Sequence, residues 1–233
     1  METANIWAVV PAYNEEKMIG MVVEGLKSAV QNIVVVDDCS IDRTREIAEQ
    51  AGAIGLRHRL NRGQGAALQT GMSYALLHGA DIIIHFDADG QHSVQDIPSL
   101  IGPLKAKVCD VVLGSRFLRF DTHASMPAMR KIFLKAAILF TSFFSGIRLT
   151  DTHNGLRAFS RTAAERIRIT EKAMAHASEI LHEIARLRLR VTEVPVTIRY
   201  TAYSLEHTKA RGDSSLKRIV NIIRRLIWSK LLS

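Results

Sequence analysis

The chain of 233 residues has little cysteine and no long apolar run. Its two cysteines, Cys39 and Cys109, lack the spacing of metal ligands, so we expect free thiols in a reducing compartment. The longest apolar stretch, residues 136–147, contains Ser and Thr and is shorter than the roughly 20 residues that a membrane span needs. We recognise no secretory signal at the beginning of the sequence. We therefore expect a cytoplasmic protein, either soluble or attached to the inner face of a membrane.

Positive charge is scarce in the first half of the chain and abundant in the second. Residues 1–110 carry 9 Lys and Arg against 14 Asp and Glu, whereas residues 111–233 carry 22 against 9. The basic half indicates an anionic partner, such as nucleic acid, anionic lipid or a phosphorylated substrate. It lacks the strand motif and the finger spacing of nucleic-acid modules, so we expect no nucleic-acid partner. A solvated basic surface without a particular partner is the alternative.

Short β-rich runs alternate with amphipathic segments through the first half. This pattern predicts an α/β fold with a mostly parallel central sheet and, because the runs are nearly continuous in apolar residues, helices on both faces. The expected strands are residues 6–10, 33–37, 53–58, 81–86 and 111–114, and the expected helices between them are residues 15–30, 42–50, 64–78 and 94–106. Functional residues should lie at the carboxyl ends of these strands.

Clusters of polar residues follow four successive expected strands. The last cluster contains Asp87 and Asp89, and two carboxylates at the point where a buried strand opens into solvent predict a site for Mg²⁺ or Mn²⁺. Such carboxylates could instead cap the next helix. Gly63 and Gly65, which open a helix, could let backbone amides approach a phosphate or form a plain turn. We expect the four clusters to converge on one crevice.

Together these motifs resemble glycosyltransferase family 2, which has the GT-A fold, and within it the dolichyl-phosphate mannose synthase-like or polyprenyl-phosphate glycosyltransferase-like branch. The resemblance runs through residues 10–15, 36–44, 61–67, 87–92, 114–117 and 151–159. It implies an inverting, metal-dependent transfer of a hexose from a UDP- or GDP-sugar to a polyprenyl or dolichyl phosphate. Transfer to a saccharide hydroxyl in cell-surface polysaccharide synthesis, and a non-catalytic nucleotide- or lipid-binding relative, are the alternatives. One departure is Cys39, where the family usually has Gly; a positive φ angle there would strain the cysteine.

The resemblance also implies roles for single residues on the donor side. The residues expected to contact the nucleoside, sugar or diphosphate are Pro11, Tyr13, Glu15, Asp38, Gly65, Asp87, Arg116, Lys209 and Arg211. Asp87, Asp89 and Gln91 are expected to hold the divalent cation, which neutralises charge on the departing nucleoside diphosphate. Arg116 is expected to bind phosphate through its planar fork of donors. Lys209 and Arg211 belong to an expected mobile loop that closes over the diphosphate, or to a flexible loop without catalytic duty.

On the acceptor side, the resemblance implies catalytic roles for Asp151, together with Asp89 and Arg116. Asp151 would serve as a base for a hydroxyl acceptor, whereas a lipid phosphate is already ionised and needs none. Alternatively, Asp151 buttresses a loop, and Arg157 either pairs with it or binds the acceptor phosphate.

We expect one domain with three parts. Residues 1–115 form the half that binds the nucleotide-sugar, residues 116–215 form the acceptor side, and residues 216–233 form a basic amphipathic helix. That last segment has the composition of a helix at a membrane surface, although packing against the core explains its periodicity equally well.

Overall fold

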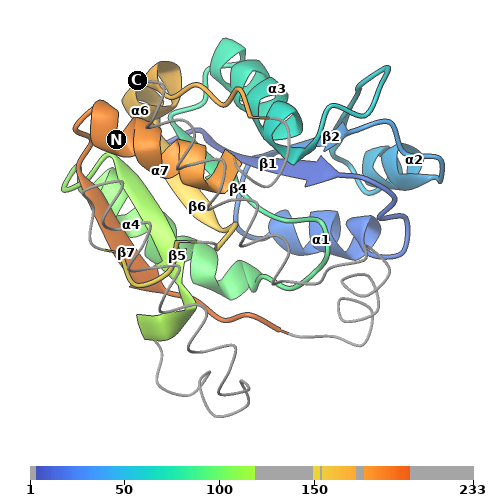
Figure 1. The fold of residues 1–233 in the computed structure, drawn as a ribbon. Coiled ribbons are helices and arrows are strands. Elements are labelled where there is room, and N and C mark those ends of the chain that lie inside the picture. Colours follow the sequence, from blue (N-terminus) through green and yellow to red (C-terminus); the bar gives the residue numbers. More distant parts are fainter. Residues whose placement is uncertain (1–3, 119–148, 153, 172–175, 200–233) are drawn as a thin grey trace, which may run out of the picture. The chain divides into compact units, whose positions relative to one another are not determined.

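The computed structural model describes residues 4–118, 149–152, 154–171 and 176–199 (Figure 1). They belong to one compact unit, Met1–Arg199. A second unit, Tyr200–Ser233, lies outside the described residues, and with it the expected helix 216–233 and the loop that contains Lys209 and Arg211. Among the described residues, no helix combines the length and apolar character needed to cross a membrane.

One sheet of seven strands organises the described residues. The strands are β1 (Ile6–Ala12), β2 (Asn32–Asp37), β3 (Ile54–Arg57), β4 (Ile82–His85), β5 (Val111–Ser115), β6 (Arg157–Ser160) and β7 (Val191–Pro195). Their order in the sheet is β3-β2-β1-β4-β6-β5-β7. All neighbouring pairs are parallel except those of β6, which runs antiparallel to β4 and β5. The expected α/β fold with a mostly parallel sheet is confirmed.

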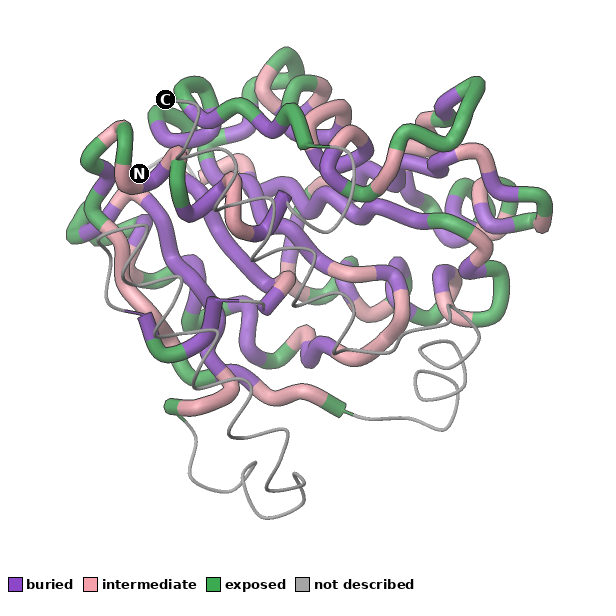
Figure 2. The backbone as a smooth tube through the Cα atoms, in the orientation of Figure 1, coloured by how far each residue is buried: buried purple, intermediate pink, exposed green. Residues whose placement is uncertain are grey.

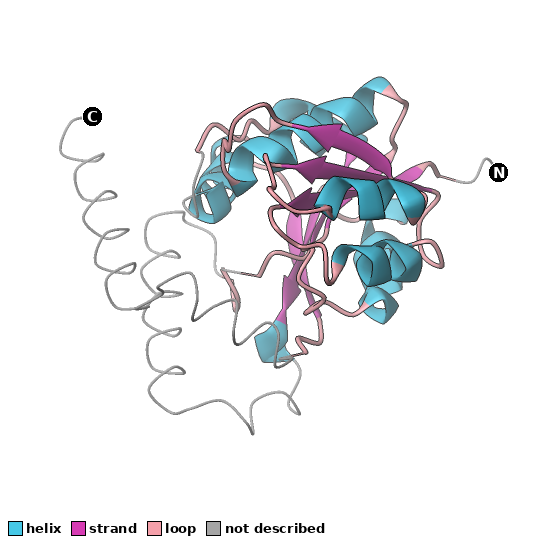
Figure 3. Ribbon diagram, turned by 90° about the vertical axis from the view of Figure 1, so that its right-hand side faces the viewer, coloured by secondary structure: helices cyan, strands magenta, loops and turns pink. Residues whose placement is uncertain are grey.

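Helices cover both faces of this sheet, as expected (Figure 3). They are α1 (Ile19–Leu26), α2 (Thr44–Gln50), α3 (Gln64–Leu77), α4 (Ile97–Lys105), α6 (Arg161–Arg166) and α7 (His176–Arg186), with short 3₁₀ turns η1 (Val94–Asp96) and η2 (Arg116–Leu118). Successive residues of a strand point to opposite faces. Ala8 and Val10 of β1 accordingly pack in the core with α1, α2 and α4, whereas Trp7 and Val9 pack with α3, α6 and α7.

The central strands are buried along their length (Figure 2), which is why they read as continuous apolar runs in the sequence. Gly71 of α3 lies so close to β1 that an added Cβ would be 2.3 Å from Cγ1 of Val9. This close packing fixes α3, and with it the loop before α3, against the middle of the sheet.

The topology determines where the polar clusters lie. The neighbouring strands β3, β2, β1 and β4 run parallel, so their carboxyl ends share one edge of the sheet. The sequence pattern did not predict β6, which separates β4 from β5. β6 and β7 follow residue 115 in the sequence and belong to the same sheet as β1 to β5.

Candidate active site

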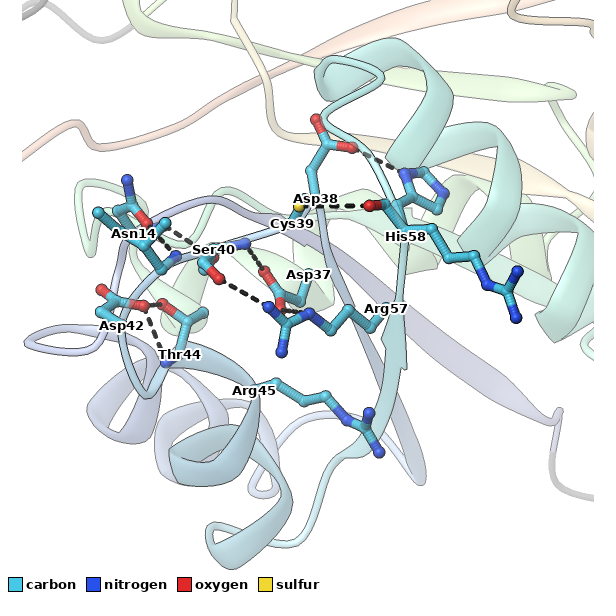
Figure 4. Close-up of polar contacts among 12 residues, drawn as sticks. Asn14, Asp37, Asp38, Cys39, Ser40, Asp42, Thr44, Arg45, Arg57 and His58 are labelled. Carbon is cyan, nitrogen blue, oxygen red and sulfur yellow. Dashed lines mark hydrogen bonds and ion pairs between the residues drawn. The ribbon is translucent and has the colours of Figure 1, made fainter.

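The loops after β1 and β2 are joined by a network of short hydrogen bonds (Figure 4). The amide of Asn14 donates to Oγ of Ser40 over 2.9 Å, and Oδ1 of Asn14 accepts from the amide of Ile41 over 3.0 Å. Asn14 has a φ angle of 56°, a conformation that Asn tolerates better than most residues. Asp37 accepts from the amide of Ser40 over 2.8 Å and so stabilises the turn. The two strand ends therefore form one rigid platform.

Asp38 organises the loop after β3. It is 3% exposed, and Oδ1 accepts from the amide of Arg62 over 2.8 Å while Oδ2 accepts from the amide of Gly63 over 2.6 Å. Its Oδ1 also lies 2.7 Å from Nδ1 of His58, whose Nε2 lies 3.0 Å from Oγ1 of Thr70 in α3. The carboxylate is thus surrounded by protein partners, and its expected contact with a nucleoside base stays a prediction.

The structure answers the question raised by Cys39. Its φ angle is 68°, so a cysteine occupies a left-handed position that glycine adopts at lower cost. Its Sγ lies 3.6 Å from the carbonyl oxygen of Arg59, which links the turn after β2 to the loop after β3.

The other residues expected to contact the nucleoside differ in accessibility. Pro11 lies within β1 and is buried, Glu15 is buried at the start of the next turn, and Tyr13 is 38% exposed. Tyr13 is therefore the side chain of these three that a ligand can reach. Gly65 is buried, and an added Cβ would lie 2.0 Å from the carbonyl oxygen of Glu171. This close approach explains the glycine by packing within the protein, whereas its expected approach to a ligand stays a prediction.

The carboxylates of Asp87 and Asp89 follow β4 and are both partly exposed. Oδ2 of Asp87 lies 2.9 Å from Nε2 of His92, and Oδ1 accepts from Nε2 of Gln64 over 3.0 Å. Asp89 accepts from the amide of Gln91 over 3.0 Å. Gly155 packs directly on Asp87, since an added Cβ would lie 2.1 Å from Oδ2.

The surroundings of Asp87 keep its carboxylate ionised. Burial opposes the charge, but the hydrogen bond with His92 and the electrostatic interactions with His92, His176 and Arg157 hold the pKa of Asp87 below its ordinary value. An ionised carboxylate at the edge of the sheet is the form that a hard cation requires.

The chemistry of these side chains fits a magnesium-type ion. Among the described residues, no three His, Cys, Asp or Glu side chains are grouped as a complete set of metal ligands. Mg²⁺ bound near phosphates keeps several waters and takes only one or two carboxylates, which Asp87 and Asp89 can provide. Gln91, the third expected ligand, is partly buried, and its main-chain carbonyl oxygen accepts from the main-chain amide of Arg199 over 2.8 Å.

Arg116 and Asp151 form a bidentate pair after β5. Nε of Arg116 donates to Oδ2 of Asp151 over 2.7 Å and Nη2 to Oδ1 over 3.0 Å, and Asp151 is 3% exposed. The amides of Thr150 and Asp151 donate to the carboxylate of Glu193 in β7 over 2.8 and 3.1 Å. The sequence suggested Arg157 as a partner of Asp151, but among the described residues the direct pair is made by Arg116, which was expected only to bind phosphate. Both oxygens of Asp151 thus serve to orient Arg116.

A buried polar layer under Asp87 could not be foreseen from the sequence. His85 is fully buried in β4, and burial, with the charges of Arg157 and His176, lowers its pKa to about 3. Its ring lies 4.8 Å from that of Phe159, measured between centroids. Arg157, at the start of β6, is buried beside it. In the sequence, His85 is a single polar residue inside an apolar run, and Arg157 was considered only as a partner of Asp151 or of the acceptor phosphate.

The seven-stranded, mostly parallel sheet with helices on both faces has the arrangement of the GT-A fold. The structure resembles the crystal structure of glucosyl-3-phosphoglycerate synthase from Mycobacterium tuberculosis in complex with Mn²⁺, UDP and phosphoglyceric acid, with a TM-score of 0.67 and 21% identity, over 89% of this chain and 75% of that chain. Residues 7–168 match the model of glycosyl transferase family 2. The chain belongs to this family.

Two relatives cover nearly the whole chain. A UDP-N-acetylglucosamine–dolichyl-phosphate N-acetylglucosaminyltransferase of Methanococcus voltae is 35% identical over 97% of this chain and 96% of its own length. An undecaprenyl-phosphate mannosyltransferase of Micrococcus luteus is 29% identical over 94% of this chain and 93% of its own length. The resemblance to the polyprenyl-phosphate branch of the family is confirmed.

Proposed function

We propose that this glycosyltransferase moves a hexose or an N-acetylhexosamine from a nucleoside diphosphate sugar to a polyprenyl phosphate, with a divalent cation as cofactor and inversion at the anomeric carbon. The observation that carries the proposal is the position of Asp87 and Asp89 at the edge shared by the ends of β1 to β4. The names of the two relatives support a polyprenyl phosphate acceptor, and the transferred sugar is N-acetylglucosamine in one name and mannose in the other.

Asp87 and Asp89 would hold the cation, with Gln91 as a further candidate ligand. When bound, the cation would neutralise the charge that develops on the departing nucleoside diphosphate. Arg116 would contact a phosphate through N–H groups other than the two that donate to Asp151 over 2.7 and 3.0 Å, and the pair with Asp151 would hold its guanidinium in a fixed orientation. Lys209 and Arg211 are proposed to assist from outside the described residues.

The acceptor step needs no general base. An oxygen of the ionised acceptor phosphate would attack the anomeric carbon, and the bond from this carbon to the diphosphate oxygen would break with its electron pair leaving on the diphosphate. Asp151 is engaged through both oxygens with Arg116. This arrangement favours a phosphate acceptor over a saccharide hydroxyl, for which Asp151 would have to accept a proton.

The test is transfer of radiolabelled sugar from UDP-GlcNAc, UDP-glucose and GDP-mannose to undecaprenyl phosphate, with Mg²⁺, Mn²⁺ or a chelator. We expect an organic-soluble product with one donor that disappears with the chelator and in the Asp89→Asn variant. Label that reaches a saccharide hydroxyl but not the lipid phosphate would favour the alternative acceptor. No transfer from any donor to either acceptor would refute the proposal.

We also propose that the chain meets its lipid acceptor by attachment to the surface of the membrane. The support comes from the sequence of residues 216–233, where isoleucines and leucines alternate with Lys and Arg. Vesicles that contain anionic lipid should co-sediment the whole chain and not a chain that ends before Leu216. Equal sedimentation of both would exclude this segment as the membrane anchor.

A further inference from the structure

A buried cation lies between the strands that lead to the carboxylates of the proposed site. Arg157 is the first residue of β6, which is inserted between β4 and β5. β4 leads to Asp87, and β5 leads to the pair of Arg116 and Asp151. Arg157 is 3% exposed. The unexpected antiparallel strand therefore places a buried arginine between the strand that leads to Asp87 and the strand that leads to Arg116.

Arg157 uses little of its hydrogen-bonding capacity on the protein. Its Nε donates to the carbonyl oxygen of Asn154 over 3.0 Å, and this is the hydrogen bond that the guanidinium donates within the described residues. Two positions earlier, Gly155 packs against Asp87. Within the part of the chain that the structure describes, the guanidinium forms no direct ion pair with Asp87, so its effect on this carboxylate is electrostatic.

The charge of Arg157 is permanent at neutral pH. Burial lowers the pKa of Arg157 to about 10, and the negative charges of Asp87 and Asp151 oppose this shift. A fixed positive charge beside Asp87 repels the divalent cation that we propose binds there, and this repulsion is stronger in the protein than in water. The same charge attracts a diphosphate.

We propose that Arg157 makes cation binding at Asp87 and Asp89 dependent on the donor diphosphate, because its charge weakens binding of the bare cation and favours binding of the anion. The inference rests on the proposed function, since it takes both ligands from it. In this proposal Arg157 acts through its charge and not by contact with either ligand, and it is a positioning residue. The site as a whole then binds a cation and a diphosphate together more readily than it binds either ligand alone.

The experiment is calorimetric titration of the whole chain with Mn²⁺ alone, with UDP or GDP alone, and with Mn²⁺ at saturating nucleotide. We expect Arg157→Gln to bind Mn²⁺ alone about tenfold more tightly than the wild type and to bind the nucleotide without metal more weakly. Arg157→Lys keeps the charge and should restore the wild-type pattern. The matched control is Arg161→Gln, which removes a surface charge four residues away, where the side chain pairs with Glu165.

If the role of Arg157 were purely structural, its replacement would weaken the binding of both ligands. Tighter binding of Mn²⁺ together with weaker binding of the nucleotide therefore distinguishes the two explanations. Weaker or unchanged binding of Mn²⁺ alone by a folded Arg157→Gln variant would overturn the proposal. If this variant does not fold, the wild type is measured instead. Its affinity for Mn²⁺ should be about tenfold or more higher with saturating nucleotide than without it, and an unchanged affinity would overturn the proposal. A wild type that binds neither nucleotide, even with Mn²⁺, would instead refute the proposed function.

Discussion

Gly155→Ala places a methyl group where the carboxylate of Asp87 now lies. The new Cβ would be 2.1 Å from Oδ2, 2.8 Å from Cγ and 3.0 Å from Oδ1 of Asp87. Atoms do not approach to 2.1 Å without bonding, so the carboxylate must move by about 1 Å. Its bonds to His92 at 2.9 Å and to Gln64 at 3.0 Å cannot both survive this movement.

We expect Gly155→Ala to lower the transfer activity more than the stability of the fold. A displacement of about 1 Å at a group that positions the reactants costs about 100-fold in rate, so we expect kcat/KM for sugar transfer to fall by about this factor. The loss of one charged hydrogen bond should lower the free energy of unfolding by about 1–3 kcal/mol. The assays are transfer to undecaprenyl phosphate at varied donor concentration and urea unfolding followed by circular dichroism.

Gly102→Ala is the matched control, because an added Cβ at this position in α4 has nothing within 4 Å. We expect its free energy of unfolding to rise by about 0.5–1 kcal/mol, because Ala is favoured over Gly in a helix interior, and its activity to stay at the wild-type level. A Gly155→Ala variant as active as Gly102→Ala would refute the argument that the position of Asp87 limits transfer.

Three further outcomes follow from the contacts described. The hydrogen bonds from Arg190 hold the pKa of Asp110 below its ordinary value, so this pair stabilises the folded state above about pH 4 and the contribution is lost as the pH falls further. Asp110→Asn should accordingly cost about 1 kcal/mol at pH 7 in urea unfolding and progressively less as the pH falls below about 4, and a cost that does not fall with pH would contradict this. Cys39→Gly should raise the free energy of unfolding by about 1 kcal/mol through relief of its positive φ angle, whereas Cys39→Ser should not. Arg116→Lys keeps the charge but loses the fork that meets both oxygens of Asp151, so kcat/KM should fall at least about tenfold; wild-type activity in this variant would show that the fork is dispensable.

The central strands were predictable because their signal is local. Each of β1, β2 and β4 is a short apolar run buried on both faces, and each is followed by a helix whose apolar residues face the same sheet. Parallel strands joined by such helices bring their carboxyl ends to one edge, so the convergence of Asp38 and Asp87 on that edge followed from sequence order alone.

The partners of the site residues were not predictable in this way. Asp38 meets His58 and Asp151 meets Arg116 across separations of 20 and 35 residues, and no local pattern identifies one arginine or histidine among many as the partner. Arg157 is the clearest example. Its sequence context, between apolar residues, gave no sign that β6 would enter the sheet next to β4.

The signs of the charges at the site explain why these long-range pairs matter for the proposed chemistry. Asp87, Asp89 and Asp151 provide three carboxylates, while two guanidinium groups come from Arg116 in η2, directly after β5, and from Arg157 in β6. A site built only from the carboxylates would hold a cation without its substrate, and one built only from arginines would hold any phosphate. With both kinds of charge fixed by the sheet, each ion compensates the unfavourable charge that the other meets, so the site we propose selects a cation and a diphosphate as a pair.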